Sequence, residues 1–170
     1  GVVSGSDTIA GNVVLNGGTF GGSHNIAGSL TATSDPVIIA PGNSAGVITV
    51  GGNMVVNANT TFNFELGAPG SLVDSDLIDI TGSLTLDGTL NVAALGGFGE
   101  GTYRLFNYNV GGLSGPGLTL GTTPPGLGFS YEISTATDGQ IDLLVSVPWG
   151  QFDTNRDGVE NSLDIDDIYL

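Results

Sequence analysis

Short runs in which apolar and polar residues alternate follow one another along most of the chain. Phe62–Leu66 reads Phe-Asn-Phe-Glu-Leu, and Leu84–Val92 alternates in the same way. Alternation with period two is typical of β-strands with one buried and one solvated face. Strands are therefore expected at Val37–Ala40, Val47–Val50, Thr61–Leu66, Leu77–Ile80, Thr89–Leu95, Thr102–Tyr108, Phe129–Ser134 and Gln140–Val147.

Four segments share a further pattern of four positions: a β-branched residue, any residue, a glycine, and then either Asn or Ser. A short apolar or Thr-containing run follows in each. Their first residues are Ile9, Ile26, Val50 and Ile80, which lie 17, 24 and 30 residues apart. A fixed motif at unequal spacing indicates coils of one kind that are joined by turns of different length. A β-sandwich would instead need regularly spaced hairpins with two-residue turns.

The pattern therefore favours an all-β fold, a parallel β-helix (β-solenoid) of about six or seven coils over residues 1–147. Val, Ile, Thr and Phe dominate the strands, and Gly-Gly, Pro-Gly and Asn-Gly pairs supply the turns. A second region, residues 148–170, is expected to form a short acidic tail that is helical after Leu163.

The repeats also resemble a known family. The segments Ala40–Val56 (with Pro-Gly-Asn-Ser after Ala40), Asp76–Val92 and Gly97–Phe106 are similar to the strand repeats of autotransporter passenger domains and to the segment that follows them. The resemblance covers about residues 9–147. It implies a right-handed parallel β-helix that a bacterium exports to its surface or beyond.

The tail contains the one stretch whose spacing predicts a metal site. Residues 153–164 read Asp-Thr-Asn-Arg-Asp-Gly-Val-Glu-Asn-Ser-Leu-Asp, with Gly158 at the sixth position, where such a loop turns sharply. Oxygen ligands at positions one, three, five, seven, nine and twelve suit calcium. The expected ligands are Asp153, Asn155, Asp157, Val159 through its carbonyl, Asn161 and Asp164.

The tail is similar to one repeat of a dockerin, in which an Asp-terminated calcium loop opens a short helix. The similarity rests on Val159–Leu170, which spans the second half of such a repeat. A dockerin has two repeats and this chain contains one, so a cohesin-type partner remains open. An acidic, solvated turn is the alternative interpretation of the same residues.

Composition narrows the possible partners. The chain of 170 residues has 17 acidic and two basic residues, which gives a formal net charge of −15, and it has no cysteine. This charge makes nucleic acid and anionic membranes improbable partners, and no apolar stretch is long enough to span a membrane. The absence of cysteine excludes disulfides and thiol catalysis.

The remaining candidate sites are weaker. Asp74, Asp76 and Asp79 could form an acid/base group, but Arg104 is expected to be an isolated cation and lysine is absent. His24 is expected in a solvated turn. Tyr103, Phe106, Tyr108, Phe129 and Tyr131 could form a sugar-stacking stripe or could pack in the core.

These observations predict a structural protein rather than an enzyme. We expect an extracellular or cell-surface β-solenoid subunit that stacks head to tail on copies of itself, because no cap is evident before Thr8 and the tail is the single candidate cap at the other end. Calcium would order the C-terminal joint. The alternative is a calcium-dependent adhesin or a dockerin-like module that binds another surface protein or a glycan.

Overall fold

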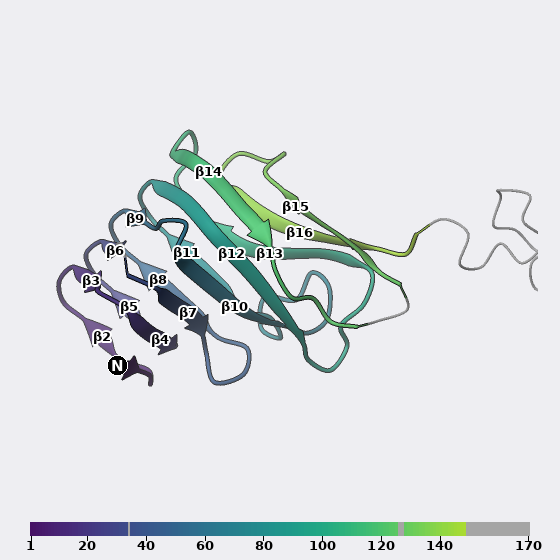
Figure 1. Ribbon diagram of the computed structural model, residues 1–170, viewed down its shortest axis with the longest axis horizontal. Helices are drawn as coiled ribbons and strands as arrows, with labels where there is room; N and C mark the ends of the chain where they lie inside the picture. The colour runs from purple at the N-terminus through teal and green to yellow at the C-terminus, as the bar shows by residue number, and fades with distance from the viewer. Residues whose placement is uncertain (34, 126–127, 149–170) are drawn as a thin grey trace, which may run out of the picture.

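Two sheets build the body of the protein in the computed structural model, which describes residues 1–33, 35–125 and 128–148 (Figure 1). The first sheet contains β1 (Val2–Val3), β3 (Val13–Leu15), β4 (Gly18–Gly22), β6 (Leu30–Ala32), β7 (Val37–Pro41), β9 (Met54–Val55), β10 (Thr60–Leu66), β12 (Leu84–Ala94) and β14 (Leu113–Leu120). The second contains β2 (Thr8–Ile9), β5 (Asn25–Ile26), β8 (Val47–Val50), β11 (Leu77–Ile80), β13 (Gly101–Asn107), β15 (Ser130–Ser134) and β16 (Gln140–Ser146). The described residues contain no helix, and hence none that could cross a membrane.

The chain coils between the two sheets, and each strand from β1 to β12 pairs in parallel with the equivalent strand one coil later. In the second sheet, Ile9 lies beside Ile26, Ile26 beside Val50, and Val50 beside Ile80. These four residues are the first positions of the sequence motif. The predicted repeat is therefore a stack of parallel coils, as expected for a β-solenoid, while the right-handedness of the coil stays a prediction.

The core lies between the sheets and consists of rows of apolar side chains that run across the coils. Ile26, Val50 and Ile80 form one buried row, and Leu30, Met54 and Leu84 form another. Full burial of one such side chain stabilises the fold by about 1.5–3 kcal/mol. Because each coil alone leaves its apolar face open, the coils are stable only when stacked.

The turn after each of these strands explains the glycine and the Asn or Ser of the motif. Asn12 Oδ1 accepts the N–H of Ser29 at 2.9 Å, Ser29 Oγ accepts the N–H of Asn53 at 3.0 Å, and Asn53 Oδ1 accepts the N–H of Ser83 at 3.0 Å. Each of these side chains occupies the space where a Cβ of the next motif glycine would lie. Only glycine therefore allows the side-chain ladder to form.

The C-terminal part of the body differs from the expectation. The second sheet has five parallel strands (β2, β5, β8, β11 and β13), after which β16 pairs antiparallel with β13, and β15 antiparallel with β16. The prediction of parallel coils over all of residues 1–147 is therefore wrong for β15 and β16, whereas the first sheet stacks six parallel strands (β1, β4, β7, β10, β12 and β14). The β15–β16 hairpin covers the last parallel strand of this sheet, so the tail is not the single candidate cap at this end.

The predicted boundary near residue 147 lies at the end of the described residues. The expected helical tail lies outside them.

The turn ladder generates a first prediction. Gly82→Ala should lower the free energy of unfolding by about 1–3 kcal/mol, because its Cβ would overlap Asn53 Oδ1 and the Gly52 carbonyl. Urea unfolding followed by circular dichroism measures the change. Gly11→Ala is the matched control, since this glycine holds the same motif position with no atom near its Cβ. Equal urea midpoints for the two variants would contradict the proposed role of the ladder.

Candidate binding groove

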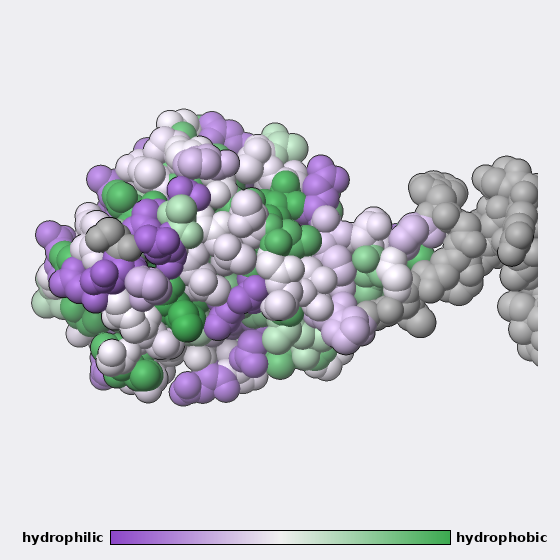
Figure 2. Space-filling view, in the orientation of Figure 1, coloured by the Kyte–Doolittle hydropathy of each residue, from purple (hydrophilic) through white to green (hydrophobic). Residues whose placement is uncertain are grey.

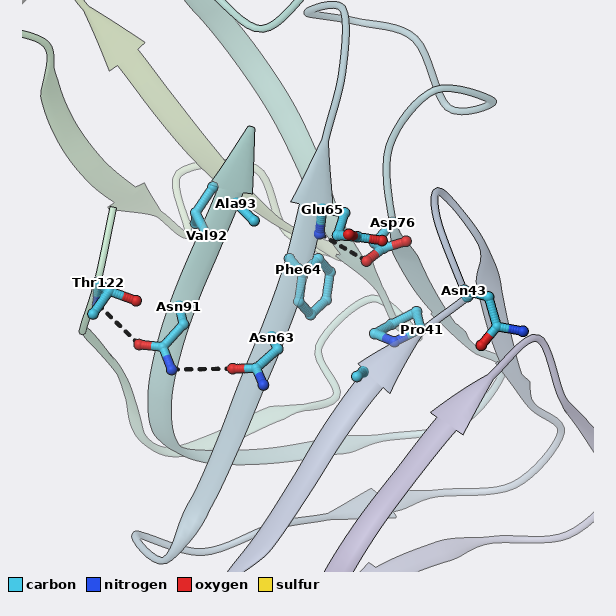
Figure 3. A pocket seen from close by; sticks show the side chains of 12 residues that line it. Pro41, Asn43, Asn63, Phe64, Glu65, Asp76, Asn91, Val92, Ala93 and Thr122 are labelled. Atoms are coloured by element: carbon cyan, nitrogen blue, oxygen red, sulfur yellow. Dashed lines mark hydrogen bonds between the residues drawn. The ribbon is translucent and has the colours of Figure 1, made fainter. Parts of the chain in front are cut away.

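A groove of about 500 Å³ lies at the carboxyl ends of the neighbouring parallel strands β7, β10 and β12 (Figure 3). Parallel pairing brings these strand ends together, so residues that are distant in sequence share one surface. The groove is lined by Ala40, Pro41, Gly42, Asn43, Asn63, Phe64, Glu65, Asp76, Asn91, Val92, Ala93 and Thr122. Five of its six polar side chains carry an amide or a carboxyl group.

Asp76 forms the buried side of the groove and ties two coils together. Its Oδ1 accepts the N–H of Gly46 at 2.8 Å, and its Oδ2 accepts the N–H of Glu65 at 2.7 Å. The residue is fully buried. Asp76 is the last residue of the segment between β10 and β11. Its carboxylate fixes the end of this segment to Gly46 of the preceding coil and to Glu65 on β10.

Burial raises the pKa of Asp76 to about 7, and the charge of nearby Glu65 acts in the same direction. The two amide donors act against this shift because they stabilise the carboxylate. Asp76 is therefore a structural acid that binds its proton more tightly in the folded protein than in the unfolded chain.

A row of amides forms the opposite side of the groove. Asn91 Oδ1 accepts the backbone N–H of Thr122 at 2.9 Å, and Asn91 Nδ2 donates to Asn63 Oδ1 at 3.0 Å. Figure 3 shows both bonds, with Asn63 and Asn91 side by side on β10 and β12. These contacts hold both amides in one orientation.

The three acids that the sequence singled out do not meet. Asp74 is exposed and accepts a hydrogen bond from Ser71 Oγ at 2.7 Å, whereas Asp79 is exposed on β11 and accepts one from Asn107 Nδ2 at 3.2 Å. No group of three metal-ligating side chains occurs within the described residues. The geometry gives an acid/base mechanism by these three residues no support.

The expectation of an isolated cation at position 104 is wrong. Arg104 Nε lies 2.5 Å from Asp142 Oδ1, and Arg104 Nη1 donates to Asn107 Oδ1 at 2.8 Å. Asp142 lies on β16, 38 residues further along the chain, so local sequence carried no sign of the pair. Arg104 therefore neutralises an acid of the second sheet and takes no part in the groove.

The expectation of a solvated His24 is also wrong. The side chain is buried, its ring centroid lies 4.7 Å from that of Phe20, and its Nε2 lies 2.9 Å from the Gly21 carbonyl oxygen. Nδ1 has no hydrogen-bond partner among the described residues. The ring extends the core at the N-terminal end of the body.

The aromatic residues of the late strands pack in the core or against it. Tyr103, Phe106 and Tyr108 are buried, and Phe129 and Tyr131 are half-buried against the same core. The Tyr103 hydroxyl donates to the Gly99 carbonyl at 2.9 Å and lies 3.3 Å from the Gly67 carbonyl oxygen. Core packing, one of the two alternatives, is therefore the role of these side chains.

The six predicted calcium ligands lie outside the described residues. The calcium site at Asp153, Asn155, Asp157, Val159, Asn161 and Asp164 therefore stays a prediction from sequence. The groove, by contrast, was not predicted. Asn63 and Asn91 are single residues on separate strands, and only the register between β10 and β12 brings them together.

Comparison with known proteins agrees with the autotransporter resemblance of the repeats. No family model matches the chain. In an alignment of 113 residues that covers 62% of this chain, it is 45% identical to the adhesin BmaC autotransporter of Brucella suis biovar 1 (strain 1330). The chain spans 3% of the length of that protein. The similarity supports a passenger-like body and says nothing of a dockerin-like tail.

The buried carboxylate generates a second prediction. Because the folded-state pKa of Asp76 lies near 7, above its ordinary value of 3.8, the folded protein holds more protons than the unfolded chain between these values. The free energy of unfolding should therefore fall, by a few kcal/mol from this group, as the pH rises from about 4 to about 7. Asp76→Asn should remove this contribution.

Chemical unfolding at several pH values measures the difference between wild type and variant. Asp74→Asn is the control, because it removes an exposed acid and leaves both hydrogen bonds from backbone N–H groups to Asp76 in place. Parallel pH profiles for wild type and Asp76→Asn would show that Asp76 binds no proton in this range.

Proposed function

We propose that this chain is a segment of a bacterial cell-surface adhesin, in which a non-enzymatic β-solenoid displays its outer face to a binding partner. The observation that carries the proposal is the 45% identity to an autotransporter adhesin, found in a body of stacked parallel coils. The proposal includes export to the surface of a bacterium.

The architecture suits a display role. Each coil adds about 4.8 Å to the length of the stack, and its inward side chains alone maintain the core. Outward positions whose side chains make no bond between coils, such as Thr61 on β10, can therefore vary with little loss of stability.

The charge of the chain limits the class of partner. The two basic residues are Arg104, which is paired with Asp142, and Arg156, which lies outside the described residues. A net charge of −15 repels nucleic acid and anionic surfaces. Neutral or basic partners are compatible with this surface.

Self-association through stacked coils is the second candidate function. Val2, Val3 and Val14 of the first coil are 74%, 50% and 58% exposed, and β1, β2 and β3 leave one edge of each strand unpaired in the described structure. Hydrophobic side chains reach the surface at this end of the molecule (Figure 2). Unpaired strand edges recruit further strands, so a further coil, from the same protein or from a second copy, could stack here.

A calcium-binding tail completes the proposal. The support is the spacing of the oxygen-bearing residues in the loop Asp153–Asp164. Calcium would reduce the negative charge of a tail that carries six acids between Asp153 and Asp167, and would order the C-terminal joint of a stacked assembly.

The adhesin proposal predicts that the chain alone confers adherence. Inert beads coated with it should attach to host-cell monolayers in greater number than beads coated with bovine albumin, and soluble chain should compete with them. Albumin has a similarly acidic charge, so a difference would not arise from net charge. Equal attachment of both kinds of bead, at matched coating density, would contradict the proposal.

The calcium proposal predicts saturable binding in isothermal titration calorimetry. The double variant Asp153→Asn/Asp157→Asn should lose the binding heat, because it removes two carboxylate ligands, whereas Asp74→Asn/Asp79→Asn removes two acids of the body and should retain it. Electron microscopy with calcium and with a chelator then tests the joint. Rods that lengthen only with calcium would support stacking, and short rods in both conditions would contradict it.

A further inference from the structure

The groove at the ends of β7, β10 and β12 presents hydrogen-bonding atoms that the fold itself leaves unused. The N–H of Thr122 must face an oxygen, so Asn91 turns its amide nitrogen toward Asn63, and Asn63 turns its oxygen toward Asn91. Asn63 Nδ2 is thereby left without a hydrogen-bond partner in the described part of the chain. Its side chain is exposed on β10.

Glu65 supplies an acceptor beside this donor. It lies two residues after Asn63 on the same face of β10, which places the two side chains about 7 Å apart along the strand. Its half-buried carboxylate has no hydrogen-bond partner among the described residues, whereas both oxygens of Asp76 are engaged by amides. The groove thus holds one oriented donor and one free acceptor.

The charge around the groove excludes acidic ligands. Glu65 and Asp76 are its ionisable groups, and Arg104 is engaged by Asp142 on the other sheet. A carboxylated, sulfated or phosphorylated ligand would therefore meet repulsion without a compensating cation. Hydroxyl groups, in contrast, donate to a carboxylate and accept from an amide at the same time.

We infer that this groove binds a glycan without acidic groups, with Asn63 donating to one sugar hydroxyl and Glu65 accepting from another. This assignment rests on the proposed adhesive function and names the class of its ligand. Ala93, which is exposed, and Ala40, which is half-buried, supply the apolar surface in the groove against which the C–H faces of a sugar can pack. Asn91 and Thr122 act as positioning residues, because they hold the amide of Asn63.

The affinity of one groove should be low. Phe64 contributes to the lining, but its side chain is 1% exposed, so it offers no open ring face on which a sugar could stack. Hydrogen bonds to solvated groups contribute little net free energy each. Adherence through such a site depends on many copies at one surface, where linked binding events raise the avidity.

Titration of the full chain with uncharged oligosaccharides tests the inference. The probes are N-acetylchitohexaose, cellohexaose and mannohexaose, with oligogalacturonate as the acidic counterpart and hexalysine as a basic peptide. Protein-detected NMR should show saturable shifts of Asn63 and Asn91 with at least one uncharged oligosaccharide. The double variant Asn63→Ala/Glu65→Gln should weaken that binding by about tenfold.

Thr61→Ala is the matched control, since Thr61 projects from the same face of β10 but does not line the groove. It should leave the affinity unchanged, and circular dichroism checks that each variant is folded. Binding of none of the uncharged probes, or binding that the double variant leaves intact, would overturn the assignment. A response to hexalysine alone would overturn it in favour of a basic protein partner.

Failure of the glycan inference can be distinguished from failure of the adhesin proposal. Coated beads that adhere equally well to host cells before and after enzymatic removal of surface glycans would reject the glycan and keep the adhesin. Beads that do not adhere at all would reject the adhesin, while the NMR titration would still report on the groove.

Discussion

The coil-to-coil ladder of the turns is the contact on which the rest of the molecule depends. A side-chain oxygen of Asn12, Ser29 or Asn53 accepts the backbone N–H at the same turn of the next coil, and a glycine leaves room for it. This contact holds the register of the strands. Since side chains alternate along a strand, a slip by one residue would turn the apolar rows outward and the Thr and Asn rows inward. The core therefore exists only while the turns stack.

The same stacking accounts for the groove. Parallel coils place the ends of β7, β10 and β12 next to one another, and the segment between β10 and β11 leaves the coil before it returns at Asp76. The carboxylate of Asp76 holds this returning segment in place by accepting two hydrogen bonds from backbone N–H groups, at the cost of a buried charge. The shape of the proposed binding surface thus depends on one acid, and the same acid makes the stability of the body depend on pH.

Much of the β-structure was predictable, because alternation and the repeat are local properties. The eight expected strands coincide with β7, β8, β10, β11, the second half of β12, β13, β15 and β16. The strand β14 was missed, since Gly115, Pro116 and Gly117 are typical of a turn. It forms because a register shift against β12, between Thr85 and Asp87, accommodates these residues. Arg104 was misjudged because its partner Asp142 lies on another strand, β16. His24 was misjudged although Phe20 and Gly21 are close to it in sequence, because a polar, glycine-rich stretch is typical of an exposed turn.

The sequence by itself determined the repeat and which residues of each strand are buried, because the alternation of side chains along a strand decides both. It is also the sole basis for the calcium loop at Asp153–Asp164. Only the tertiary structure decided the number of parallel strands, the antiparallel β15–β16 hairpin, the partner of Arg104 and the residues of the groove. Alternation is the same in parallel and antiparallel strands, and the lengths of the connecting turns decide which residues of distant coils come to lie side by side.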